Sequence, residues 1–136
     1  MHTLGHAFTM VPTTDLETTV AAYVSSGLTK LWQPDEDTIL LGVRDRAVVM
    51  VEDDATERGL GCGPVLLVDD LSALRPAAPV EWAIAPMPVP VGRYGAARRQ
   101  GTLIRYLDLS SCAEADRGWF AACLVTGSRT SAPVPP

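Results

Sequence analysis

Cysteine is too scarce in this sequence to form a disulfide framework. Cys62, Cys112 and Cys123 are odd in number and irregularly spaced, which also argues against a zinc knuckle. We interpret them as core thiols. With 47% hydrophobic and 20% charged residues over 136 positions, the chain has the composition of one ordinary globular domain with a real core.

Long apolar runs and basic stretches are missing as well. The longest hydrophobic segments are too short to span a bilayer, and no basic region followed by an apolar segment opens the chain. Residues 1–70 hold 12 acidic and 4 basic side chains, and an acidic chain without a basic stripe binds nucleic acid poorly. We therefore expect a soluble cytoplasmic protein with neither a membrane nor a nucleic-acid partner.

Two common signatures of enzyme chemistry are also absent. Gly92, Gly95 and Gly101 do not form a phosphate loop, because no Gly-x-Gly-x-x-Gly pattern follows a strand and opens a helix. The serine pairs at 25–26 and 110–111 lack the glycine elbow that hydrolases use. Neither nucleotide binding nor serine hydrolysis is therefore supported.

The clearest local pattern is a strand that leads directly into a helix. The mostly apolar run 6–11, closed by Pro12, predicts a strand buried on both faces. Thr14 and Glu17 fit a capping box. Apolar residues then follow at spacings of three and four, which predicts a helix ending at Gly27.

A fainter copy of this unit begins 55 residues later, where Asp70-Leu71 repeats Asp15-Leu16. Its helix must be short because Pro76 and Pro79 interrupt it. We expect residues 52–63 to be a linker and 86–90 to be an edge strand or a loop. The other expected strands cover residues 28–33, 38–43, 47–52, 64–68, 80–85, 93–98 and 102–109. An internal repeat is better support for an architecture than any single element.

The repeat divides the chain into parts of one structural domain. We expect a first βαβββ module over residues 1–58 and a second, with a shortened helix, over 59–111. Residues 112–136 are expected to form a C-terminal helix and a disordered tail.

This arrangement resembles the vicinal oxygen chelate superfamily, the group of glyoxalase I, bleomycin resistance proteins and extradiol dioxygenases. The resemblance covers residues 4–110 and is carried by positions 6, 11–17, 23, 27–28, 68–71, 92–95 and 101–105. It implies an α+β fold in which two βαβββ half-barrels face each other around a cavity. It also implies a homodimer, since members of the superfamily often pair and share cavities between chains.

Metal-using members of the superfamily place ligands on the first and last strand of each unit, which implies four positions to compare. His6 fills the first position. The second falls at or near Met50, with Glu52 two residues further on, the third at Gly63 and the fourth at Arg105. One ligand of four is fewer than the three that a catalytic divalent site needs, and a guanidinium would repel a cation. We expect neither a metal nor another cofactor.

Six residues are predicted to line a ligand site: His6, Trp32, Met50, Trp82, Tyr94 and Arg105. The aromatic residues suit stacking on a planar ligand, or they are plain core. His6 is a relic ligand, a general base, a hydrogen-bond donor or a neutral residue of the cavity wall. Arg105 lies on an otherwise apolar strand, so it requires an anionic ligand or a protein carboxylate such as Glu81.

Two functions follow from this comparison. The favoured one is a metal-free small-molecule binder of the bleomycin resistance type, which sequesters or shuttles an apolar or aromatic natural product and has no catalytic residue. The alternative is a metal-dependent lyase, isomerase or dioxygenase of the glyoxalase type, with a displaced site formed by His6 and Glu52, to which His2 could add a third ligand.

Overall fold

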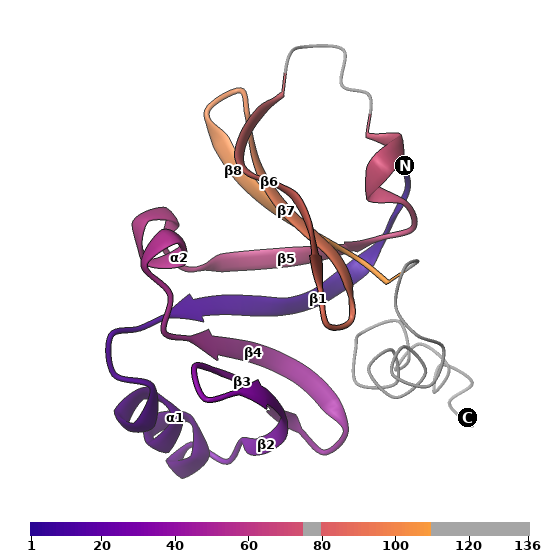
Figure 1. Cartoon of the computed structure of the whole chain (residues 1–136). Helices are drawn as coiled ribbons and strands as arrows, with labels where there is room; N and C mark the ends of the chain where they lie inside the picture. The colour runs from indigo at the N-terminus through magenta and orange to yellow at the C-terminus, as the bar shows by residue number, and fades with distance from the viewer. Residues whose placement is uncertain (75–79, 110–136) are drawn as a thin grey trace, which may run out of the picture.

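The computed structural model describes residues 1–74 and 80–109. These residues form one curled eight-stranded sheet with the strand order β2-β3-β4-β1-β5-β8-β7-β6 (Figure 1). The first half of the chain contributes β1 (Thr3–Pro12), α1 (Leu16–Ser25), β2 (Thr29–Asp35), β3 (Thr38–Val43), β4 (Arg46–Glu52) and α2 (Ala55–Leu60). The second half contributes β5 (Gly63–Val68), a 3₁₀ turn η1 (Leu71–Ala73), β6 (Glu81–Val89), β7 (Gly92–Arg99) and β8 (Thr102–Asp108).

The strand pairing confirms that the fold consists of two related modules. β1 runs parallel to β4, β5 runs parallel to β8, and the modules join where β1 and β5 pair antiparallel. In the first module Met10 lies opposite Met50, and at the corresponding place in the second module Val65 lies opposite Arg105. Met50 and Arg105 are therefore equivalent positions of the repeat.

The helix α1 forms where the sequence predicted it, but with a different cap. Its N-cap is Asp15, whose Oδ1 accepts the Thr18 amide at 3.1 Å, so the predicted capping box of Thr14 and Glu17 is wrong. The Thr13 hydroxyl accepts a hydrogen bond from the Asp15 amide at 3.0 Å. Aspartate is a strong N-cap residue. The helix ends as expected, with Gly27 at a φ of 104°.

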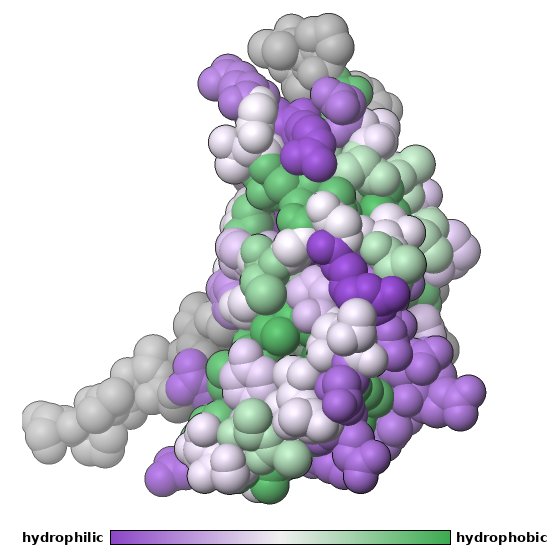
Figure 2. All heavy atoms as spheres, turned by 90° about the vertical axis from the view of Figure 1, so that its left-hand side faces the viewer, coloured by the Kyte–Doolittle hydropathy of each residue, from purple (hydrophilic) through white to green (hydrophobic). Residues whose placement is uncertain are grey.

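The two faces of the sheet carry separate cores. One face packs Val20 of α1 on the first module's strands, and another cluster packs Leu71 of η1 on the second module. The opposite face gathers apolar residues from both modules into the largest cluster, which includes Phe8, Met50 and Tyr94. Figure 2 shows the side on which α1 and α2 lie, where hydrophilic and hydrophobic side chains are interspersed.

One stretch differs from the sequence-based expectation, because the expected linker over 52–63 contains the helix α2. Residues 86–90 were expected to be an edge strand or a loop, and β6 continues through Pro86 and Pro88 as an edge strand. β6 is the last strand of the sheet, where a residue without an N–H costs no ladder hydrogen bond on the open side. The helix expected over 113–125 and the tail lie outside the described residues. None of the helices described is long and apolar enough to cross a lipid bilayer.

Candidate functional site

A small pocket lies where the inner face of the first module meets the turn between β6 and β7. Its volume is about 110 Å³. The residues that line it come from both modules: Phe8, Met10, Trp32, Pro34, Asp35, Thr38, Met50, Glu52, Val89, Pro90, Val91, Tyr94 and Leu107. In Figure 1 the β6–β7 hairpin turns back toward the first module's strands, which is how these distant segments come together.

Three of the six residues predicted to bind a ligand line this pocket. Trp32, Met50 and Tyr94 are in its wall. The other three lie elsewhere: Trp82 packs against the cluster around Leu71 and Tyr106, and Arg105 is buried behind the pocket. His6 Nε2 lies 3.3 Å from the Thr9 hydroxyl and is not in the pocket wall.

The polar part of the pocket consists mainly of Glu52 and Thr38. The Thr38 hydroxyl donates to Glu52 Oε2 at 2.9 Å. Burial raises the pKa of the Glu52 carboxyl above its usual value, and the charges of Glu57, Asp54 and Asp35 act in the same direction, whereas the Thr38 hydrogen bond opposes them. Glu52 is thus a carboxylate whose surroundings disfavour its charge.

Behind the pocket, Arg105 forms a buried ion pair with Glu57 of α2. Glu57 Oε1 accepts from Arg105 Nε at 3.1 Å and from NH2 at 3.0 Å. The other oxygen, Oε2, accepts from the Tyr94 hydroxyl at 2.7 Å. Arg105 NH2 also donates to the Gly61 carbonyl at 2.5 Å. The two charged residues are only 2% and 3% exposed, so the carboxylate is neutralised by direct contact rather than by water.

Of the two expected partners of Arg105, an anionic ligand or a protein carboxylate, the structure shows a protein carboxylate, but it is Glu57 and not Glu81. Glu81 is exposed and lies opposite Arg98 on the edge of the sheet. The expectation of a linker over 52–63 leaves Glu57 out of the predicted site, whereas the structure places it in α2. The signals were nevertheless present: Asp54 and Glu57 have capping spacing, and Gly61 follows the apolar Leu60. Burial raises the pKa of the Tyr94 hydroxyl above its usual value, and the charge of Glu57 and the hydrogen bond to it act in the same direction, whereas Arg105 opposes them.

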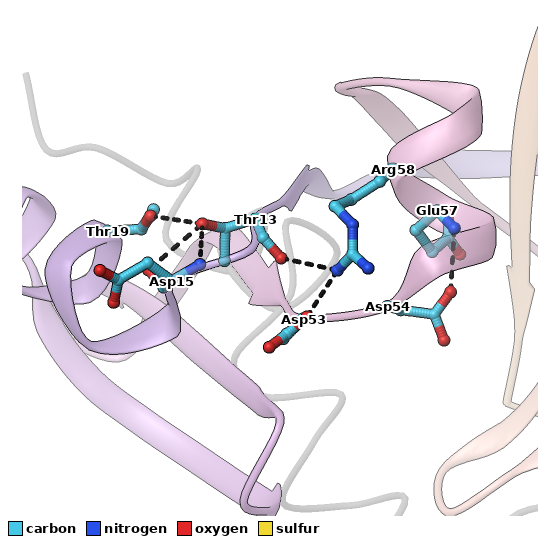
Figure 3. Close-up of polar contacts among 7 residues, drawn as sticks. All are labelled: Thr13, Asp15, Thr19, Asp53, Asp54, Glu57 and Arg58. Carbon is cyan, nitrogen blue, oxygen red and sulfur yellow. Dashed lines mark hydrogen bonds and ion pairs between the residues drawn. The ribbon is translucent and has the colours of Figure 1, made fainter.

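A polar network holds α2 in the position from which Glu57 reaches Arg105. Arg58 NH1 donates to the Thr13 carbonyl at 3.0 Å and to Asp53 Oδ1 at 2.5 Å (Figure 3). The Asp54 carboxylate accepts the Glu57 amide at 2.9 Å, capping α2. Arg58 therefore ties the helix between the modules to the turn that precedes α1.

The residues at the four metal-ligand positions of the superfamily do not fit a divalent ion. The Arg105 guanidinium occupies the fourth position, and a Cβ at Gly63, the third, would lie 3.0 Å from Arg105 NH1. Met50 supplies a thioether at the second position, which is a poor ligand for hard cations. No group of three potential ligands among His, Cys, Asp and Glu occurs within residues 1–74 and 80–109.

The displaced metal site of the alternative hypothesis is not assembled either. The β1 residue opposite Glu52 is Pro12, and His6 is six residues away along the strand, about 20 Å at the rise of an extended chain. His2 instead pairs with Asp69, with Nδ1 and Oδ2 3.2 Å apart. We therefore derive no reaction step through a metal.

No protein-family model and no curated protein sequence matches the chain, but solved structures share its fold. An uncharacterised protein from Methanosarcina mazei is 19% identical with a TM-score of 0.53, over 83% of this chain and 98% of that one. A Mn(II)-bound glyoxalase from Novosphingobium aromaticivorans is 18% identical with a TM-score of 0.56, over 82% of this chain but 41% of that one.

A methylmalonyl-CoA epimerase from Streptomyces coelicolor, solved with 2-nitronate-propionyl-CoA, gives 14% identity and a TM-score of 0.52, over 83% of this chain and 99% of that one. At these identities the likeness is one of fold. The chain has the fold that the glyoxalase and the epimerase share, which confirms the fold that the resemblance implied.

Proposed function

We propose that this protein binds a small apolar or aromatic molecule in the pocket between its two modules and does so without a metal. The observation that carries the proposal is the pocket wall itself, which combines Phe8, Met10, Met50 and Trp32 with one partly buried carboxylate, Glu52. Apolar walls with few polar groups are typical of small-molecule sites, and methionine side chains adapt to irregular ligands.

The size of the pocket limits what one chain can enclose. Its volume of about 110 Å³ is below that of the roughly 150 Å³ engineered cavity that accommodates benzene. A larger natural product would therefore insert one ring and leave the rest outside. Sequestration of such a product requires a second surface, and a homodimer of this chain in the cytoplasm is our proposal for it.

The polar groups near the pocket do not favour an enzymatic role. Arg105, Glu57 and Tyr94 hydrogen-bond one another, so their polar atoms are engaged within the protein. Glu52 has Thr38 as a hydrogen-bond donor, and the pocket wall contains no histidine. Its other ionisable side chains are Asp35 and Tyr94, and the Tyr94 hydroxyl donates to Glu57. We assign no catalytic residue.

Titration of the full chain with toluene, followed by NMR, tests this proposal. Trp32→Ala should weaken toluene binding severalfold because it removes part of the wall. Trp82→Ala, a tryptophan on the same sheet but outside the pocket, should leave the affinity unchanged. Equal loss in both variants, or no toluene binding by the unmodified protein, would show that the pocket is not the ligand site.

Native mass spectrometry of the freshly purified protein adds an independent check. It reports the subunit number and any retained molecule in one measurement. We expect a dimer, either at the bare polypeptide mass or with an organic adduct. A stoichiometric divalent ion would contradict the metal-free proposal.

A further inference from the structure

The pocket wall has charge of one sign only. Its two charged residues are Glu52 and Asp35, and the described residues that line it include no lysine, arginine or histidine. The nearest buried cation is Arg105, which faces Glu57 and the Gly61 carbonyl. An anionic ligand would therefore meet repulsion from Glu52 without a compensating positive group.

The acidic side chains around Glu52 differ in their ion-pair and hydrogen-bond partners. Glu57 pairs with Arg105, Asp54 caps α2, and Asp35 accepts the amide of Asp37 at 2.8 Å. Glu52 forms no ion pair with any residue of the described ranges, and its protein hydrogen bond comes from the neutral Thr38 hydroxyl. A partly buried carboxylate facing an apolar pocket is costly unless a cation approaches it.

We propose that the ligand is a compact organic cation, namely a protonated amine attached to a single apolar ring. This inference rests on the proposed function. Its ammonium group donates to the Glu52 carboxylate, while the ring packs against Met10 and Met50. Trp32 lies in the same wall, and an indole face favours a nearby cation through its quadrupole. Charge-assisted hydrogen bonds from ammonium to carboxylate are about twice as strong as neutral ones.

Three ring compounds of similar shape test the ligand class on the full chain. Benzylamine is a cation at neutral pH, benzyl alcohol is neutral and benzoate is an anion. We expect benzylamine to bind on the order of tenfold more tightly than benzyl alcohol, the factor that one charge-assisted contact supplies, and benzoate to bind most weakly. The amine's advantage should shrink as the pH falls through the pKa of Glu52.

Two matched variants distinguish direct contact between the amine and Glu52 from attraction to the protein's overall negative charge. Glu52→Gln should remove the preference for benzylamine over benzyl alcohol, with folding checked by circular dichroism. Glu36→Gln alters net charge equally at an exposed turn outside the pocket wall and should preserve the preference. A preference that survives Glu52→Gln, or is lost equally in both variants, overturns the inference.

The outcomes also distinguish this inference from the proposed function. If the three compounds bind with equal affinity, the pocket is a ligand site but the cation inference is wrong. Stronger binding of benzoate would likewise overturn the cation inference alone. If none of the three binds, both the ligand class and the pocket proposal fail.

Discussion

Equivalent positions of the two modules carry side chains of opposite character, one apolar and one charged. In the first module, Met50 on β4 faces an open apolar pocket and a carboxylate at Glu52. In the second module, the equivalent Arg105 on β8 fills the interior with a guanidinium that pairs with Glu57 and, through it, with Tyr94. The first module thus leaves space for a ligand, whereas the second module fills the corresponding space with side chains of its own.

The comparison shows how the interior of the second module is filled by charged side chains that neutralise each other. Arg105 brings a fixed positive charge to this interior, and α2 supplies the balancing carboxylate, Glu57, from the connection between the modules. The Arg105–Glu57 ion pair thus links α2 to β8. We infer that the Arg105–Glu57 pair makes the interior of the second module rigid, and that the ligand binds at the first module's inner face, where the turn between β6 and β7 completes the pocket.

The largest expected effect is the loss of the buried ion pair. Glu57→Gln should lower the free energy of unfolding by about 3–5 kcal/mol, because it leaves the Arg105 charge buried without its partner. Asp53→Asn is the matched control, since it breaks the partly exposed Arg58 pair and should cost at most about 1 kcal/mol. Urea denaturation measures both, and equal losses would contradict the distinction between the two pairs.

Making the second module resemble the first should recover much of that loss. We expect the triple variant Glu57→Leu, Tyr94→Phe, Arg105→Met to be more stable than Glu57→Gln alone. The reason is that it removes all three polar groups together and leaves no buried charge. Denaturation under the same conditions is the measurement. A triple variant less stable than Glu57→Gln would mean that the ion pair itself, not the avoidance of an orphaned charge, stabilises the fold.

A smaller effect is expected in the first module. The pKa of Glu52 is raised in the folded protein, so protonation favours the folded state, and this contribution is lost as the pH rises through that pKa. Glu52→Gln should therefore raise the melting temperature slightly at neutral pH and have no such benefit in acid. Melting temperatures of the variant and the unmodified protein, measured from acid to neutral pH, test this expectation. A variant that is less stable at neutral pH would show that the Glu52 charge is compensated.

Sequence patterns predicted the repeated architecture well, because strand and helix periodicity is local. The strand over 38–43 and the end of α1 at Gly27 follow directly from apolar spacing and glycine conformation. The short copy of the helix was also foreseen from its prolines and appears as η1. Such features depend on neighbours within a few residues.

The site was predicted less completely, because its contacts join distant segments. Glu57 and Arg105 are 48 residues apart, and no local pattern states which carboxylate an arginine will meet. His6 illustrates the same limit: the pairing of β1 with β5 shifts register between His6 and Phe8, and Phe8 lines the pocket while His6 does not. A single irregularity in a strand can thus redirect a side chain that alternation would place inside.

The most direct test of the contrast between the modules is a map of amide chemical shifts during titration of the full chain with toluene. We predict that the largest changes fall on Phe8, Met10 and Met50 in the first module, with small changes at Gly61 and Arg105. Changes centred on Arg105 and Gly61, or around His6 and Trp82, would contradict the assignment of binding to the pocket at the first module's inner face and of rigidity to the Arg105–Glu57 pair.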